Sequence, residues 1–426
     1  MIITIFGTFI ILILLNVPIA LVLGGTSIFA LATRTHTPLT IVLQQYFNGI
    51  DSASLLAIPL FILAGNLMAT GGISKRLVDF ANVLVGRFKG GLGYVAVISC
   101  IFFGAISGSG PATTAAIGTV MVPYMKKKGY SAPLSLALVA SAGLLGVLIP
   151  PSIPMVVYGV TAGVSISKLF LAGVGPGLLL GGFLMVAWAY FAKKYDYVQD
   201  EPSTLKETWV SFKNAITALL MPVIILGGIY SGIFTATEAA AVACVYSLFI
   251  SMVVFKELKF SDLRKVAYDT ATSTGTIALL LANAVLFGWL LVTQQIPQNI
   301  AAWVTSLTTN PYIILFAFNI FLLILGCLVN TTAAIVLVTP IFLPTLLAVG
   351  LDPLFIGVVM VVNLAIGMIT PPVGLNLFVA SGLDKDVGLS QIVKANTLFL
   401  VVLVIGLMLV TYIPAISLAL PNILMH

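Results

Sequence analysis

The sequence predicts an all-α polytopic membrane protein. Three observations predict this class: 60% of the 426 residues are hydrophobic, only 8% are charged, and long apolar stretches recur along the chain. A soluble protein carries roughly 25% charged residues to keep its surface wetted, so a water-soluble fold of this size is excluded. The net charge of +6 is typical of cationic loops that orient a membrane protein, and it indicates no nucleic-acid partner.

Seven stretches are long enough to cross the hydrocarbon core, which takes about 20 helical residues. The first lacks the basic segment and the cleavage site of a signal peptide, so we expect a retained helix that is kinked near Pro18. Two histidines and three cysteines without a CxxC pair indicate neither a metal site nor a disulfide framework. The seven stretches lie at about 2–33, 41–70, 169–192, 214–231, 235–255, 264–293 and 392–420.

Two further apolar regions are interrupted near their centres. Region 91–125 is cut at Ser107–Pro111, and region 312–348 is cut near Asn330. Each half has only about 15 residues, too few to cross a bilayer. The sequence therefore predicts two re-entrant helical hairpins, whose polar tips lie at mid-membrane and are shielded from lipid by protein or water.

Each hairpin is followed by a helix that two adjacent prolines interrupt. Segment 131–165 contains Pro150-Pro151, and segment 353–381 contains Pro371-Pro372. Adjacent prolines remove two backbone donors and obstruct the preceding turn. We therefore predict that both helices are discontinuous.

Short motifs recur in the same order in the two halves of the chain. The pentapeptide at Thr113 is identical to the one at Thr331, and the pattern Gly-x-x-x-Pro-Pro at Gly146 recurs at Gly367. The sequence therefore predicts an internal structural repeat. A weaker match pairs Leu67–Ile73 with Leu290–Ile296.

The basic residues predict the orientation of the repeats. All Lys and Arg except Arg34 and Lys168 fall in loops that can share one side of the membrane, and the positive-inside rule makes that side cytoplasmic. The first hairpin then opens towards the cytoplasm and the second opens away from it. We therefore expect an inverted repeat, with the N-terminus cytoplasmic and the C-terminus periplasmic.

These features divide the chain into five segments. The polar linker around Trp209 is either an interfacial amphipathic segment or a plain solvated loop. The segments are the scaffold helices and cytoplasmic arm of repeat 1 (1–90), the transport elements of repeat 1 (91–192), the linker and connecting helix (193–231), the scaffold helices of repeat 2 (232–311) and the transport elements of repeat 2 (312–426).

Broken helices at mid-membrane predict an ion and solute site. Unpaired backbone groups there are costly unless something binds them. Freed carbonyls suit a desolvated alkali cation, and half-helix N-termini suit a carboxylate. The predicted residues are Ser107, Gly108, Ser109, Gly146, Ile149 and Ser152 for a first Na⁺ site; Gly326, Asn330, Gly367, Thr370 and Val373 for a second; and Gly110, Pro111, Thr113, Thr331, Thr332 and Asn376 for the substrate.

Two alternatives bear on these residues. The small side chains could serve only close helix packing. Glu238 and Asp51 are either gate or ion residues or acidic residues in the first turn of their helices. The tips and breaks carry no ionisable side chain, which favours Na⁺ over H⁺ as the coupling ion, and no cofactor is expected.

Several runs resemble the large, DctM-type membrane subunit of tripartite ATP-independent periplasmic (TRAP) transporters, and most of all those of sialic acid (N-acetylneuraminate) systems. The resemblance covers essentially the whole chain. It implies an elevator-type carrier of the ion-transporter superfamily that imports an organic acid with the Na⁺ gradient across the bacterial inner membrane. It also implies two partners, a small four-helix membrane subunit and a periplasmic substrate-binding protein. The runs are Leu55–Gly65, Ser107–Thr114, Ile149–Pro154 and Thr237–Ala241.

Two other classes of function compete with this interpretation. A stand-alone Na⁺/dicarboxylate symporter or Na⁺/H⁺ antiporter would need no partners, whereas a TRAP subunit could import a C4-dicarboxylate or a sugar acid instead of sialic acid. An intramembrane enzyme would need a metal-ligand cluster, a Ser/Lys or Ser/His pair, or paired aspartates, and the sequence shows none of them in its helices. We therefore predict a transport protein and not an enzyme.

Overall fold

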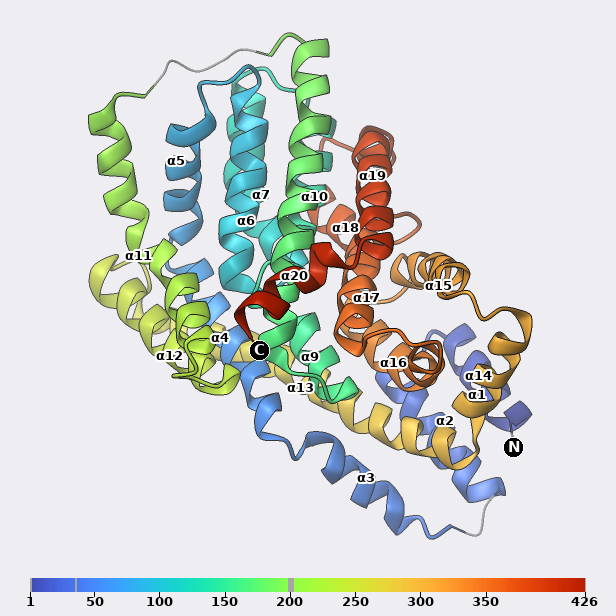
Figure 1. The fold of residues 1–426 in the computed structure, drawn as a ribbon. Coiled ribbons are helices and arrows are strands. Elements are labelled where there is room, and N and C mark those ends of the chain that lie inside the picture. The colour runs from blue at the N-terminus through green and yellow to red at the C-terminus, as the bar shows by residue number, and fades with distance from the viewer. Residues whose placement is uncertain (1, 35–36, 198–202, 426) are drawn as a thin grey trace.

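The computed structural model is a bundle of helices (Figure 1) and describes residues 2–34, 37–197 and 203–425. These residues form no strand, so the predicted all-α class is confirmed. Both histidines and the middle of the predicted linker, 198–202, lie outside the described residues. Seven helical stretches are long and apolar enough to span a membrane: Ala53–Thr70, Ile166–Lys194, Leu205–Tyr230, Ala236–Val254, Phe260–Thr293, Thr331–Ala348 and Leu389–Tyr412.

The helices of the first half run from α1 to α10. They are α1 Ile2–Leu14, α2 Ile19–Arg34, α3 Thr40–Ile50, a 3₁₀ turn Ala53–Leu56 leading into α4 Ala57–Thr70, α5 Ile73–Val85, α6 Gly91–Ser107, α7 Gly110–Lys127, α8 Ala132–Gly143 with its 3₁₀ extension Leu144–Val147, α9 Ile153–Ala162 and α10 Ile166–Lys194.

The second half runs from α11 to α20. Its helices are α11 Leu205–Tyr230, α12 Ala236–Phe249 with a π-helical turn Ile250–Val254, α13 Phe260–Thr293, α14 Ile296–Leu307, α15 Pro311–Gly326, α16 Thr331–Ala348, α17 Pro353–Gly367, α18 Leu375–Ser381, α19 Leu389–Tyr412 and α20 Ala415–Leu424.

Helices α6–α10 recur in order as α15–α19. The starts of corresponding helices differ by 220 to 223 residues (91 against 311, 110 against 331, 132 against 353, 153 against 375, 166 against 389). The Pro-Pro motifs agree with this offset, but the shared pentapeptide does not: Thr113 is the fourth residue of α7, whereas Thr331 is the first of α16. The pentapeptides are therefore three residues out of register with the helices that contain them.

The predicted first span is wrong, because 2–33 forms two short helices. Asn16 has a positive φ of 59° and Pro18 lacks an N–H, so the chain turns instead of kinking. A Cβ on Gly25 would lie 3.4 Å from the Leu12 side chain, which places α2 back alongside α1. Neither helix is long enough to appear among the candidate spans.

Two other predicted spans are also broken. Segment 41–70 separates into α3 and α4 at Asp51-Ser52, although its counterpart in the second half, α13, is continuous. Asp51 therefore follows the end of a helix and does not lie in a first turn. Segment 392–420 separates at Pro414, and α20 packs across α10, where the Ile416 carbonyl lies too close to Gly175 for any side chain there.

Helix α4, in the predicted scaffold of repeat 1, packs on α12 and α13, both in the predicted scaffold of repeat 2, and these three helices are called the wall below. Three small residues of α12 and its π turn, seven residues apart, donate to three backbone carbonyls of the α4 region that are also seven residues apart. This constant spacing shows that the two helices run in the same direction, and small side chains allow such close approach in membranes. The bonds are Thr237 Oγ1 to Ala53 O (3.0 Å), Cys244 Sγ to Leu60 O (2.9 Å) and Ser251 Oγ to Leu67 O (3.3 Å).

The hairpins and broken helices pack across the two halves of the chain. Helix α7 of the first hairpin contacts α18 as well as α8, and helix α16 of the second hairpin contacts α9 as well as α17. Each hairpin therefore lies against the broken helix of the other half. This exchange brings together elements whose starts are 265 residues apart (α7 and α18) and 178 residues apart (α9 and α16) in the chain.

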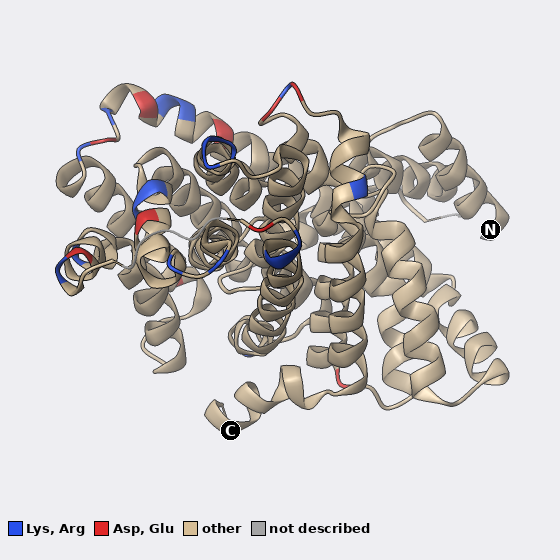
Figure 2. Ribbon diagram, turned by 90° about the horizontal axis from the view of Figure 1, so that it is seen from above, with Lys and Arg blue, Asp and Glu red and all other residues tan. Residues whose placement is uncertain are grey.

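Most charged residues lie in loops and helix ends, and the helices between them are nearly free of charge (Figure 2). The ion pairs join segments that the sequence predicts on the same, cytoplasmic side. These pairs are Arg76–Glu257 (2.7 Å), Lys89–Asp196 and Lys126–Asp384 (2.5 Å).

Candidate functional site

The tip of the first hairpin is closed by its own hydroxyl groups. Helix α6 ends at Ser107, Gly108 turns the chain with a φ of 63°, and Ser109 caps α7. Ser107 Oγ lies 2.9 Å from Thr113 Oγ1, which donates a 2.8 Å bond to the carbonyl of Ser109. These contacts hold several neutral oxygens at one point.

The first helix break lies directly against this tip. The Ile153 N–H donates to the Gly108 carbonyl at 3.2 Å. A Cβ on Gly146 would lie 2.7 Å from the Ser109 carbonyl, so only glycine allows the break to approach this closely. The structure thus brings together four of the predicted Na⁺ residues: Ser107, Gly108, Ser109 and Gly146.

The other two residues of the first predicted Na⁺ site complete the break itself. Ser152, fully buried, donates its hydroxyl to the Val147 carbonyl at 2.5 Å. That carbonyl would accept from the N–H of residue 151 in a continuous helix, and Pro151 has none. The Ile149 N–H donates to the Leu145 carbonyl at 2.8 Å, so the helical bonding continues almost to the prolines.

The second predicted Na⁺ site is only partly assembled. A Cβ on Gly367 would lie 2.6 Å from the Cα of Gly326, and the Thr370 N–H donates to the Gly367 carbonyl at 3.0 Å. Asn330 and Val373 are exposed instead. Asn330 caps α16 by accepting from the Thr332 N–H at 2.9 Å, and no hydrogen bond in the described residues joins it to the glycine contact.

A buried asparagine that the sequence analysis missed supports the second break. The amide of Asn396, on α19, donates to the carbonyl of Ile369 at 3.0 Å. The corresponding carbonyl of the first break, Leu148 O, faces Gly173 of α10, where a Cβ would lie only 2.6 Å away. An asparagine inside a predicted membrane span, with Lys394 and Thr397 close by, was the signal that could have found it.

Two predicted substrate residues meet across the repeats. A Cβ on Gly110 would lie 3.3 Å from Asn376 Oδ1, and Asn376 Nδ2 donates to the Ala140 carbonyl at 3.1 Å. Asn376 Oδ1 and Thr114 Oγ1 are both buried without a hydrogen-bond partner. A buried oxygen without a hydrogen bond costs free energy unless a ligand binds it. These two oxygens are therefore atoms that a solute could bind.

The remaining predicted substrate residues do not join that pair. The Thr113 hydroxyl donates to the Ser109 carbonyl within the first tip, and Pro111 is half-buried. Thr331 is buried with an unpartnered hydroxyl, and Thr332 takes part in the cap of α16. No hydrogen bond in the described part of the chain links either threonine to Gly110 or Asn376.

The structure favours the structural interpretation of Glu238, and it makes the chain around Trp209 a helix instead of a loop. Glu238 accepts from the Thr235 N–H at 2.8 Å and closes a capping box at the start of α12. Helix α11 begins at Leu205, so the second part of the predicted linker is helical, with Trp209 57% exposed and stacked on Phe212.

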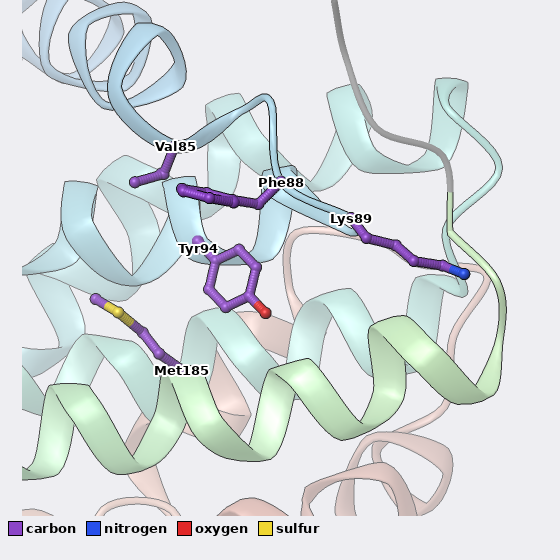
Figure 3. Close-up of a pocket in the computed structure, with 5 residues that line it drawn as sticks. All are labelled: Val85, Phe88, Lys89, Tyr94 and Met185. Atoms are coloured by element: carbon purple, nitrogen blue, oxygen red, sulfur yellow. The ribbon is translucent and has the colours of Figure 1, made fainter. Parts of the chain in front are cut away.

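Two clefts of the described residues contain no predicted site residue. One, of 420 Å³, is lined by Val85, Phe88, Lys89, Tyr94 and Met185, and Figure 3 shows the Lys89 amine pointing away from the two rings. The other, of 380 Å³, lies where the α9–α10 turn faces Ser52, Ser54 and Thr235. Neither cleft therefore opens onto the predicted sites.

The atoms that could coordinate a cation at the two breaks are neutral hydroxyl, amide and carbonyl oxygens. No group of three His, Cys, Asp or Glu side chains that could bind a metal occurs among the described residues. Hard neutral oxygens suit a monovalent cation better than a transition metal.

Comparison with known proteins decides the family. The model of the tripartite ATP-independent periplasmic transporter family, DctM component, matches residues 6–416. The chain belongs to this family. It is 47% identical to the C4-dicarboxylate TRAP transporter large permease protein DctM of Pseudomonas aeruginosa over 89% of the chain and 88% of the relative. It is 41% identical to the 2,3-diketo-L-gulonate TRAP transporter large permease protein YiaN of Escherichia coli over 81% of each.

The TRAP family resemblance is thus confirmed, and so is the prediction that the chain is not an enzyme, because its relatives are named as permeases. The chain is a multi-pass membrane component of a tripartite transporter. Its fold is also similar to the solved structure of the Alcanivorax borkumensis YdaH transporter, with a TM-score of 0.63, 14% identity and coverage of 88% of this chain and 87% of the other. At that identity the likeness concerns the fold alone.

Proposed function

We propose that this TRAP large permease is the Na⁺-coupled membrane subunit of an organic-acid importer in the bacterial inner membrane. It works with a small four-helix membrane subunit and a periplasmic substrate-binding protein. The observation that carries the proposal is the contact of the first hairpin tip with the first break, where Ser107, Ser109 and Gly146 gather neutral oxygens at one point.

The two breaks hold one Na⁺ each. The first site comprises the residues of hairpin 1 and its break, and the second forms around Gly326, Gly367 and Thr370. Asn330 and Val373 complete the second site when its tip closes. Their exposure in this structure fits a tip that closes only on binding.

The substrate is a small organic anion held between the repeats beside Gly110 and Asn376. The relatives described above carry names for a C4-dicarboxylate and a sugar acid, which favours these two classes over sialic acid. The half-helix N-terminus of α7 attracts a carboxylate, and the unpartnered oxygens of Thr114 and Asn376 suit substrate hydroxyls.

Transport proceeds by an elevator movement of an inverted repeat. The hairpins and broken helices, about 91–165 and 312–381, move as one body, because sliding the site whole keeps its polar groups paired. The packing of α7 on α18 and of α16 on α9 supports a single body. The N-terminus lies in the cytoplasm and the C-terminus in the periplasm. Na⁺ drives the cycle because it binds the inward-facing and outward-facing states with different affinities.

Uptake by the three-component system in proteoliposomes tests the Na⁺ assignment. We expect Ser107→Ala and Thr370→Ala each to raise the half-saturating Na⁺ concentration, because each removes a neutral oxygen from a different site. Thr119→Ala is the control, since Thr119 is an exposed hydroxyl of α7 that bonds only the helix backbone. Unchanged Na⁺ curves in both site variants would refute the assignment.

Omitting the partners separates this proposal from a stand-alone symporter. The large subunit alone should import little free acid, whereas adding the small subunit and a loaded binding protein should restore uptake. A panel of C4-dicarboxylates, sugar acids and sialic acid then identifies the substrate class. Efficient uptake without partners would favour the stand-alone symporter.

A further inference from the structure

A buried asparagine links the two halves of the chain at the second break. Asn396 donates its Nδ2 to the Ile369 carbonyl at 3.0 Å and accepts at Oδ1 from the Ser141 hydroxyl at 2.6 Å. Asn396 is 2% exposed and Ser141 is fully buried. Both polar atoms of the Asn396 amide are therefore committed, one to each repeat.

The two ends of this link lead to the two predicted ion sites. Ile369 immediately precedes Thr370 of the second site. Ser141 lies on α8, whose 3₁₀ extension carries Gly146 of the first site roughly 8 Å further along at the rise of a helix. A shift of α8 is therefore transmitted to the backbone of the second break through two short hydrogen bonds.

A second bond strengthens the same link. Asn376, which follows the second break, donates to the carbonyl of Ala140, the neighbour of Ser141. Its own N–H bonds the Met368 carbonyl at 2.9 Å. Adjacent residues of α8 thus hold the chain on both sides of the second pair of prolines.

The first break has no corresponding asparagine. The residue at the same position in α10, seven after the helix start, is Gly173, and there the helix backbone packs directly onto the Leu148 carbonyl. A buried amide costs free energy unless its hydrogen bonds are made. The asparagine link is therefore a feature of one repeat and does not follow from the duplication.

We propose that Asn396 is a positioning residue that makes Na⁺ binding at the two breaks cooperative. It acts through Ser141 on α8 and through the carbonyl of Ile369, and it does not itself bind the ion. When Na⁺ fixes α8 against the first tip, the link holds the second break in its binding geometry. The same coupling acts in reverse, as thermodynamic linkage requires. This inference rests on the proposed Na⁺-coupled function.

The test compares Na⁺ dependence of uptake for the three-component system carrying wild type, Asn396→Leu, Ser141→Ala or both substitutions. Wild type should show a sigmoidal Na⁺ curve. Each variant should lower its Hill coefficient towards about 1 and raise the half-saturating Na⁺ concentration about fivefold to tenfold, the effect expected from one lost hydrogen bond. The double variant should resemble the single ones, because both substitutions break the same link.

Asn283→Leu is the matched control. Asn283 is also 2% exposed and also makes two hydrogen bonds, with the Tyr46 hydroxyl at 2.5 Å and the Leu279 carbonyl at 2.8 Å, but it lies on α13 in the wall. Its loss should lower stability and leave the shape of the Na⁺ curve unchanged.

The possible results separate the inference from the function it rests on. Uptake by wild type without any Na⁺ dependence would overturn the proposed function. A sigmoidal wild type with link variants that keep its Hill coefficient, as the control does, would overturn the inference alone. If Asn396→Leu does not fold, Ser141→Ala decides the question, with Na⁺-induced thermal stabilisation of the purified complex as the second readout.

Discussion

Gly146 shows how a single residue sets the geometry of the first predicted ion site. Its Cα faces the hairpin tip, where the Ser109 carbonyl and the Thr113 side chain leave no room for a methyl group. The close approach of two backbone segments thus requires glycine at this position. The sequence only suggests this requirement, through the position of Gly146 before two prolines.

We expect Gly146→Ala to impair transport more than it impairs folding. The added methyl must push the tip away from the break, and overpacking of this kind costs about 1–3 kcal/mol. Uptake should fall by roughly tenfold or more, since 1.4 kcal/mol corresponds to a factor of ten. The matched control is Gly182→Ala on α10, which has nothing within 4 Å. Equal uptake by the two variants would show that the close approach is not needed for transport.

At this scale the residue pattern predicted only part of the site. Ser107, Ser109 and Gly146 come together as expected, because glycine and hydroxyl residues beside a break need partners there. Asn330 and Val373 are exposed, which the pattern did not predict. A position in a repeat does not determine whether a tip is closed over its neighbours. Asn396 was missed because an asparagine among other polar residues near the start of a span does not reveal which carbonyl it will bind.

Among the elements, the α4–α12 pair depends most on small side chains. Cys244 is 9% exposed and its sulfur lies 2.9 Å from the Leu60 carbonyl, in the middle of the three-bond ladder. We expect Cys244→Leu to separate the helices and to lower the free energy of unfolding by about 1–3 kcal/mol, the usual cost of overpacking.

Thermal unfolding of the purified protein in detergent measures this effect. Val245→Leu is the control, because Val245 is the next residue of α12 and is 71% exposed. Cys244→Ser keeps a small donor and should remain close to wild type. A melting temperature for Cys244→Leu that matches the Val245 variant would mean that this seam does not limit stability.

The elements also show which interruptions the sequence can reveal. The Pro-Pro breaks and the interruptions at Gly108 and near Asn330 lie where the sequence predicts them, because adjacent prolines and turn residues do not continue a helix. The expectation that every hairpin half is too short to cross the membrane does not hold for α16, which is long and apolar enough to be a candidate span. Asn16–Pro18, Asp51-Ser52 and Pro414 were read as kinks or missed, since membrane helices often tolerate single interruptions. In the structure, α2 packs on α1 and α20 packs on α10, so the chain turns at two of these interruptions and forms separate helices.

Across the whole molecule, one ion pair fastens the first hairpin to the second repeat. Lys126, at the end of α7, donates to Asp384 at 2.5 Å, and the Asp384 side chain is 8% exposed. The hydrogen bond from Lys126 holds the pKa of the Asp384 carboxyl below its ordinary value. Because the folded-state pKa is depressed, the pair stabilises the fold above the ordinary pKa and loses this effect as the pH falls through the lowered one.

Asp384→Asn should therefore lower the melting temperature by a similar amount at every pH from 7 down to about 4, the ordinary range of an aspartate. At lower pH the difference in melting temperature between the variant and wild type should narrow, because the wild-type carboxyl is then protonated and no longer pairs with Lys126. Asp386→Asn is the control, since Asp386 is an exposed carboxylate two residues away. An equal loss in both variants would assign the effect to net charge instead of to the pair.

The proposed elevator movement is tested by cysteine pairs that join the hairpins and broken helices to the wall. Pairs that join the region of Thr113 or Thr331 to the wall formed by α4, α12 and α13 should lock uptake and release it on reduction. Crosslinks at two different heights along the wall are expected in the two facing states. Finding only local crosslinks at the tips would indicate a rocking or gating cycle.

The membrane class and the positions of the helix interruptions could be predicted from the sequence, because they depend on composition and on local backbone chemistry, and the family could be recognised from the resemblance of its motifs. The sequence also determined which residue types could bind an ion. Only the tertiary structure decided that α7 packs on α18 and α16 on α9, and that Asn376 and Asn396 reach α8. Contacts between segments that are so far apart in the chain depend on how the two halves are placed in space, and an apolar sequence pattern allows many such placements.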